Sequence, residues 1–290
     1  MPTVLAACLC FRDSAPYLHE WLLFHRVQGI TRFYLYDNDS ADDYLPVLAP
    51  WLRDGTVRLR HWPGAAQQQA MFDHCLAHVD RDVAWLAFID DDEFLYSTNL
   101  RPLGETLAAF APYAGVAVSW LLYGSSGIQQ RSGEWAIQRY TNYAGVADHH
   151  VKCIVQPGRI ASATASPHAF VVRDGWSLVD ENFRPMTGPL NPAPTARVLR
   201  LNHYITKSWE ECIERRFLRV EVNTGKPKPL TLSQWREWDA NWSLAPDASA
   251  LAFVAPMRAL ESRMVPAASS LLSGISARGM DPAEPPRAVI

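Results

Sequence analysis

Residues 83–94 read Val-Ala-Trp-Leu-Ala-Phe-Ile-Asp-Asp-Asp-Glu-Phe, an apolar run that ends in four consecutive carboxylates. A continuous apolar run of this length is typical of a strand that is buried on both faces of a sheet. Adjacent carboxylates repel one another, so the arrangement costs stability unless a cation neutralises them. Apolar residues flank the acids on both sides, and we therefore favour a functional site over a solvated acidic turn.

The residues before this stretch alternate between strand and helix patterns. We expect strands at 3–10, 31–36, 57–61 and 83–89, and helices at 17–27, 44–53 and 67–79. This order predicts an α/β fold with a Rossmann-like, mostly parallel sheet. Such sheets bind ligands at the carboxyl ends of their strands. The polar clusters Arg12-Asp13, Asp37–Asp43 and Asp90–Glu93 follow three of these strands, so we expect them to converge on one crevice.

The second half of the chain has a less regular pattern. We expect strands at 115–122, 151–155 and 168–172, a Pro-rich loop at 185–194 and a helix at 209–222. The residues from about 266 onward are rich in Ala, Ser and Pro and are expected to be loosely held.

Composition excludes several classes of protein. The net charge of -3 gives no general attraction for nucleic acid or an anionic membrane. The five cysteines are an odd number without a C-x-x-C pair, which favours reduced thiols in a cytosolic protein. The N-terminus lacks the basic region and the long apolar run of a signal peptide, and no segment is apolar enough to span a bilayer. We expect a cytoplasmic protein without an integral membrane segment.

The acids suit a divalent metal. In an extended segment, Asp90 and Asp92 point to the same side, where they can hold Mg²⁺ or Mn²⁺ that bridges a diphosphate. Such a metal stabilises charge on a departing nucleoside diphosphate. The cluster lacks the spacing and central glycine of a calcium loop. A glycosidase needs its two acids on opposite sides of a sugar, so near-adjacent acids favour a metal site.

Several segments then resemble a known family. Residues 9–25, 33–40, 68–75 and 88–94 look like the donor half of GT-A fold glycosyltransferases. Together with Trp120–Gly127, Lys152–Pro157 and Leu201–Ser208, they are most similar to glycosyltransferase family 92 (formerly domain of unknown function 23) and its bacterial family 2-like relatives. The match runs in order over about residues 3 to 225. One departure is Asp13-Ser14, where the family often has Asn-Glu.

The resemblance implies a domain organisation. Residues 1–225 would form a GT-A domain whose mostly parallel sheet is flanked by helices. About residues 1–100 would bind the nucleotide sugar, and about 101–225 would form a less regular acceptor half. Residues 226–290 would be a C-terminal helical extension and a loose tail.

The resemblance also implies roles for individual residues. The metal ligands would be Asp90, Asp92 and His203, with Asp92 also catalytic. From its place before an apolar strand, His168 is a second catalytic candidate that could contact the acceptor or a phosphate, or could only form local hydrogen bonds. Donor-binding residues would be Arg12, Asp37, Asn38, Gln68, Asp90, Asp91, Lys152 and Lys207. Trp120 and Ser125 would face the acceptor. Five further carboxylates could serve as the catalytic base, and spacing does not choose among Glu134, Asp148, Asp174, Asp180 and Glu181.

The implied function is transfer of a sugar from a nucleotide sugar, a UDP-sugar by resemblance, to a hydroxyl of a glycan or lipid-linked acceptor, with inversion and with Mn²⁺ or Mg²⁺. A bacterial polysaccharide pathway fits this activity, and a lipid-linked acceptor would draw the enzyme to the membrane surface. Two alternatives stay open: a metal-dependent phosphohydrolase or nucleotidyltransferase, and a non-catalytic sugar-nucleotide-binding protein.

Overall fold

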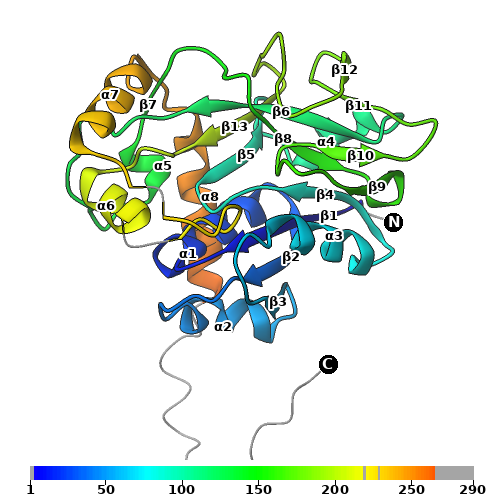
Figure 1. Ribbon diagram of the computed structural model, residues 1–290, viewed down its shortest axis with the longest axis horizontal. Coiled ribbons are helices and arrows are strands. Elements are labelled where there is room, and N and C mark those ends of the chain that lie inside the picture. Colours follow the sequence, from blue (N-terminus) through cyan, green and yellow to red (C-terminus); the bar gives the residue numbers. More distant parts are fainter. Residues whose placement is uncertain (1–2, 218–219, 228, 265–290) are drawn as a thin grey trace, which may run out of the picture.

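The computed structural model describes residues 3–217, 220–227 and 229–264. Its centre is a ten-stranded sheet with helices on both faces (Figure 1). The first half of the chain folds in the order β1 Val4–Phe11, α1 Ala15–Val27, β2 Ile30–Asp37, α2 Leu45–Arg53, β3 Val57–His61, α3 Gln68–His78, β4 Val83–Phe88, β5 Glu93–Ser97, α4 Leu103–Leu107 and the 3₁₀ turn η1 Ala108–Phe110.

The second half contains mostly short elements. They are β6 Gly115–Leu122, α5 Ala136–Arg139, β7 Asn142–Tyr143, β8 Val151–Val155, η2 Pro157–Arg159, β9 Ile160–Ala163, β10 Phe170–Val172, β11 Leu178–Val179, β12 Pro185–Met186 and β13 Leu199–His203. The chain then forms α6 Trp209–Phe217, α7 Leu232–Trp242, β14 Ala245–Pro246, η3 Ser249–Phe253 and α8 Val254–Met264.

The sheet has a parallel half and a mixed half. Strands β3, β2, β1 and β4 are adjacent in that order and all parallel, as the alternating strand and helix patterns predict. Strand β8 lies antiparallel between β4 and β6, and β13 pairs parallel with β6 and antiparallel with β5. The predicted fold class, an α/β sheet with a less regular second half, is confirmed.

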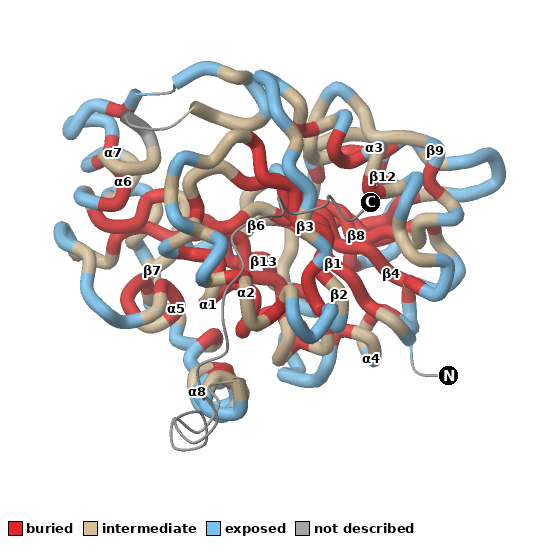
Figure 2. Tube along the Cα trace, turned by 90° about the horizontal axis from the view of Figure 1, so that it is seen from below, coloured by how far each residue is buried: buried red, intermediate tan, exposed pale blue. Residues whose placement is uncertain are grey.

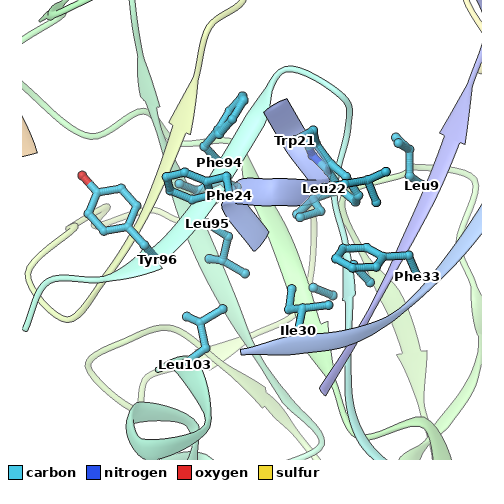
Figure 3. Close-up of a cluster of buried hydrophobic side chains, with 14 of the residues drawn as sticks. Leu9, Trp21, Leu22, Phe24, Ile30, Phe33, Phe94, Leu95, Tyr96 and Leu103 are labelled. Carbon is cyan, nitrogen blue, oxygen red and sulfur yellow. The ribbon is translucent and has the colours of Figure 1, made fainter. Parts of the chain in front are cut away.

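Alternating residues of β1 pack into two hydrophobic cores, one on each face of the sheet. Leu5, Ala7, Leu9 and Phe11 pack with α1 in one cluster, whereas Ala6, Cys8 and Cys10 pack with α3 in another. This period of two follows from the pleat of a strand that is covered on both faces. Figure 3 shows the first cluster, and Figure 2 shows the buried strands inside an exposed outer layer.

The C-terminal elements pack on the same body. Helix α8 lies beside α1, and its Met257 is fully buried in the main core together with Phe253 of η3. The expected loose tail from about residue 266 lies outside the described residues. All five cysteines are free and buried, in agreement with the expected reduced thiols. Within the described part of the chain, no helix is long and apolar enough to cross a membrane.

Two predicted boundaries are wrong. The helix expected at 209–222 ends at Phe217, and the chain from Val220 forms a turn that closes with a hydrogen bond from Gly225 N to Glu221 O. Gly225 has φ +64°, a left-handed conformation that glycine adopts without strain. The strand expected from His168 begins at Phe170, which leaves His168 in the preceding loop.

Candidate active site

The acids lie in the tight turn between β4 and β5, and side chains of α1 form hydrogen bonds with the backbone of this turn. The Trp21 indole Nε1 donates to the carbonyl oxygens of Asp90 (2.9 Å) and Glu93 (3.1 Å). One turn later on α1, His25 Nε2 accepts a hydrogen bond from the Leu95 amide at 3.2 Å. Burial lowers the pKa of His25 to about 3, so the ring is neutral and can accept this bond. Helix α1 therefore holds the backbone on both sides of the acids.

The turn sends the acidic side chains in different directions. Asp90 contacts Lys152 of β8, with Oδ2 to Nζ 2.7 Å, and Gln68 of α3 at 3.3 Å. Asp91 and Asp92 both contact Arg215 of α6. We expected Asp90 and Asp92 to lie on one side of an extended segment. This is wrong, because residues 91 and 92 form a turn.

Two basic side chains neutralise the carboxylates. The Arg215 Nη2 atom lies 2.8 Å from Asp91 Oδ1 and 2.8 Å from Asp92 Oδ2. Burial alone would raise the pKa of Asp92, but the charge of Arg215, together with His203 and Lys207, holds that pKa well below its ordinary value. Although burial opposes it, the Asp90 carboxylate keeps the pKa of Lys152 above its ordinary range. Both cations thus stay charged beside the turn.

A cavity of about 280 Å³ opens above the acids. Its walls come from elements that are far apart in the sequence: the ends of β1, β4 and β13, the start of α3, the middle of β6, the loop before β10, α6 and the segment after it. The lining residues that matter below are Ser14, Gln68, Asp90, Asp91, Asp92, Trp120, His168, His203, Arg215 and Glu221.

The structure brings together most of the residues that the sequence predicts for the site. Gln68, Asp90, Asp91, Asp92, Trp120, His168 and His203 all line the cavity. Lys152 lies directly behind Asp90, with only 1% of its side chain exposed. Lys152 was predicted to bind the donor. Its ammonium contacts Asp90 and does not line the cavity, so it could act on a donor only through Asp90.

Three predicted donor residues lie elsewhere. Asp37 accepts hydrogen bonds from the Ser40 amide and the Tyr44 hydroxyl, each at 2.9 Å. Asn38 donates to two backbone oxygens of the loop after β3. Arg12 faces Asp13, with Nε to Oδ2 3.9 Å. The clusters after β1 and β2 meet each other, since the Asp13 amide donates to Ser40 Oγ and the Ala41 amide donates to Asp13 Oδ1, but Arg12, Asp37 and Asn38 do not line the cavity.

Ser125 and Lys207 are also set back from the cavity. Ser125 is fully buried, its Oγ accepts from the Gly127 amide, and its own amide donates to Asp239. The Lys207 ammonium lies 4.2 Å from the ring centre of Tyr17. Burial, aided by the charge of Arg215, lowers the pKa of Lys207 to about 8. Neither side chain lines the cavity in this conformation.

Trp120 is the centre of a cluster of imidazole rings. The ring centres of His150, His168 and His203 lie 5.0, 5.0 and 4.4 Å from that of Trp120. His168 Nδ1 donates to the Val151 carbonyl at 2.9 Å, which leaves Nε2 as the unprotonated nitrogen. Burial, together with the nearby Lys152, lowers the pKa of His168 to about 4, so this ring is neutral near pH 7.

The five carboxylates considered as catalytic bases do not line the cavity. Glu181 accepts hydrogen bonds from the amides of residues 197, 198 and 199, which fixes the start of β13. Asp180 accepts from the amides of Asn182 and Arg184. Asp148 accepts from His150, and Glu134 and Asp174 are exposed. These positions give each of them a structural or surface role.

Arg215, Glu221 and Ser14 also line the cavity, although they were not predicted from the sequence. Arg215 belongs to a helix that also carries Arg216, and Arg219 follows in the sequence. Spacing alone cannot select one of these arginines. Only the packing of α6 against the acidic turn singles out Arg215.

The donor set fits a hard divalent cation when a substrate supplies further oxygens. Asp92 Oδ1 lies 3.4 Å from His203 Nε2 at the cavity wall, and His203 Nδ1 is buried without a hydrogen-bond partner in the described structure. A carboxylate suits Mg²⁺ and Mn²⁺, and an imidazole is a common ligand of divalent transition metals. The described residues contain no ready group of three or more His, Cys, Asp or Glu ligands. Diphosphate and water would therefore have to complete the coordination.

Comparison with known proteins places this α/β chain in a family. The glycosyltransferase family 92 model matches residues 5–188. The protein therefore belongs to glycosyltransferase family 92.

Two curated relatives are also family 92 proteins. A protein of Ricinus communis is 27% identical over 231 residues, which cover 75% of this chain and 38% of the relative. One of Arabidopsis thaliana is 26% identical over 232 residues, which cover 74% of this chain and 37% of the relative. The chain thus matches less than two fifths of the length of these relatives.

Among solved structures, S. aureus TarS 1–349 in complex with UDP aligns with a TM-score of 0.38 and 12% identity, covering 54% of this chain and 47% of that one. The complex of TarS 1–349 with UDP-GlcNAc aligns with a TM-score of 0.37 and 10% identity, covering 67% of this chain and 62% of that one.

Proposed function

We propose that the protein is a metal-dependent glycosyltransferase that moves a sugar from a UDP-sugar to a hydroxyl group of a glycan or lipid-linked acceptor. The observation that carries this proposal is the acidic turn after β4, which opens into a cavity of about 280 Å³ with His203 beside Asp92. Membership of glycosyltransferase family 92 supports the reaction class. A cytoplasmic location and a role in polysaccharide biosynthesis belong to the same proposal.

Asp92 and His203 would hold Mn²⁺ or Mg²⁺, and Asp90 faces the same cavity. When bound, the metal supplies positive charge to the departing diphosphate. The protein's own contribution is to hold the ligands in place: Trp21 fixes the backbone of the turn, and Lys152 fixes the Asp90 carboxylate. Such preorganised groups need little rearrangement during the reaction.

The cavity residues divide by chemistry into two sides. Gln68, Arg215 and the acids offer polar contacts for the diphosphate and sugar of the donor. Trp120 offers an aromatic face beside His168 for the acceptor. We propose that His168 Nε2 takes the proton from the acceptor hydroxyl, since Nδ1–H is engaged by the Val151 carbonyl. Attack by that oxygen on the anomeric carbon, as the bond to the diphosphate breaks, would invert the configuration.

Thermal unfolding with a panel of nucleoside diphosphates, each with and without Mn²⁺, tests the donor site. A ligand at about 100 times its dissociation constant should stabilise the protein by roughly 2.7 kcal/mol. We expect UDP to stabilise it more with Mn²⁺ than without, and Asp92→Asn to abolish this effect of Mn²⁺. Asp43→Asn, the same substitution at an exposed position away from the cavity, is the matched control and should respond as the wild type does.

The reaction class needs a second assay. Transfer of labelled sugar from a UDP-sugar to a panel of glycan and lipid-linked acceptors should occur and should require Asp92. Release of phosphate or pyrophosphate without sugar transfer would favour the phosphohydrolase or nucleotidyltransferase alternative. Tight UDP binding without turnover against the whole panel would favour a binding protein. No response to any nucleotide would contradict the donor-site assignment.

A further inference from the structure

Arg215 already binds two of the carboxylates of the acidic turn, Asp91 and Asp92. Its guanidinium donates to Asp91 through Nη1 (3.3 Å) and Nη2 (2.8 Å), and to Asp92 through Nη2 (2.8 Å). The Asp92 atom that it contacts is Oδ2, while Oδ1 faces His203. A divalent cation on Asp92 would therefore meet a positive charge already bound to the same carboxylate, and the two cations repel each other.

Among the described residues, the two cations that hydrogen-bond to aspartates 90–92, Lys152 and Arg215, differ in access. Lys152 has 1% of its side chain exposed and does not line the cavity. Arg215 has 17% exposed, lines the cavity and comes from α6, which ends at Phe217 shortly after it. Lys152 is therefore a fixed partner of Asp90. Of these two cations, Arg215 is the one that a ligand in the cavity can reach and displace.

A diphosphate is the ligand chemistry that can do so. A guanidinium binds phosphate oxygens in the same bidentate manner as it binds a carboxylate. If Arg215 moves onto the donor's diphosphate, Asp92 Oδ2 becomes available to the metal, and the diphosphate supplies the oxygens that Asp92 and His203 lack. The Tyr17 ring, whose centre is 5.0 Å from the guanidinium carbon, is a cation–π partner of Arg215 beside the aspartates.

We propose that Arg215 is an internal counter-cation that keeps Asp91 and Asp92 closed to a divalent cation until a nucleoside diphosphate arrives, so that metal and nucleotide bind cooperatively. The inference rests on the proposed function, because it takes the nucleoside diphosphate from there. Reciprocal linkage then requires UDP to raise the affinity for Mn²⁺ by the same factor as Mn²⁺ raises the affinity for UDP.

The test is Mn²⁺ titration of the full chain, followed by electron paramagnetic resonance of the free ion, with and without UDP. In the wild type, UDP should raise Mn²⁺ affinity by a factor in the range of about 5 to 150. In Arg215→Met, Mn²⁺ alone should bind more tightly than to the wild type, and UDP should add much less. Mn²⁺ alone should also raise the melting temperature of this variant, because it replaces the missing positive charge.

Arg200→Met is the matched control. Arg200 also has 17% of its side chain exposed and pairs with a buried aspartate, Asp247, but it does not line the cavity. It should lose stability, and Mn²⁺ should not restore it. Should Arg215→Met fail to fold, Arg215→Gln keeps one possible hydrogen bond to Asp91 without the charge, and the same Mn²⁺ titration applies.

The outcomes separate this inference from the proposed function. If the wild type shows Mn²⁺-dependent UDP binding that Asp92→Asn abolishes, but Arg215→Met binds Mn²⁺ alone no better than the wild type, the counter-cation role is refuted and the donor site stands. If UDP and Mn²⁺ do not affect each other in the wild type, cooperativity is refuted directly. If the wild type binds neither, the proposed donor site fails and the inference fails with it.

Discussion

Replacing His25 by glutamine should remove much of the protein's sensitivity to mild acid. His25 is fully buried, its Nδ1 donates to the Trp21 carbonyl at 2.9 Å, and its Nε2 accepts from the Leu95 amide. Protonation would turn Nε2 into a donor that faces another donor. Burial thus lowers the pKa of His25 to about 3 in the folded protein, against about 6.5 for an exposed histidine.

The sign and size of the effect follow from linkage. Between pH 6.5 and 3 the unfolded chain takes up a proton at His25 that the folded chain does not, so this contribution to stability is complete above pH 6.5 and declines as the pH falls. One pH unit in this window costs about 1.4 kcal/mol. Going from pH 7 to pH 5 should therefore cost the wild type about 2 kcal/mol through His25 alone.

Urea unfolding followed by tryptophan fluorescence measures this cost at several pH values. The His25→Gln variant should be less stable than the wild type at pH 7, and the gap should narrow by about 2 kcal/mol at pH 5. Other titrating groups, His168 included, are common to both proteins and cancel in the difference. The same substitution at exposed His78 is the control. A gap that stays constant within about 0.5 kcal/mol would refute the reasoning, since that is the error of comparing independent sites.

Three further predictions concern two buried charged side chains, Lys152 and Glu181, and the five cysteines. Lys152→Met should destabilise the protein by about 1–3 kcal/mol in urea unfolding, because it leaves the half-buried Asp90 carboxylate without its hydrogen-bonded cation; an unchanged unfolding midpoint would contradict the pairing. Glu181→Ala should cost about 3 kcal/mol by the same measurement, because the buried Leu199 amide and the part-buried Val198 amide lose their acceptor, and an unchanged unfolding midpoint would count against it. The native protein should react slowly with a thiol reagent and should expose all five cysteines on unfolding; rapid labelling of the native form would show that they are accessible.

The pattern of apolar and polar residues within each segment was enough to predict the parallel half of the sheet. Each strand and helix up to β4 is marked by a contiguous run of residues, and the β-α order admits few arrangements. The place of the acids at the end of a buried strand was predicted for the same reason, since the apolar run and the carboxylates are neighbours in the chain, but the turn at residues 91 and 92 was not. The expectation for Asp37 and Asn38 had the right location, at the end of β2, but composition could not tell a ligand contact from hydrogen bonds that brace a loop.

The sequence by itself determined which carboxylates follow a buried strand, and only the tertiary structure decided what neutralises them. Lys152 is separated from Asp90 by 62 residues and Arg215 from Asp91 by 124, and they arrive on β8 and α6. β13 delivers His203 to the acids by pairing with β5 and β6. Charge attraction and hydrogen bonding act over a few ångströms of space, whereas periodicity in a sequence reports only on neighbours within a few turns of chain.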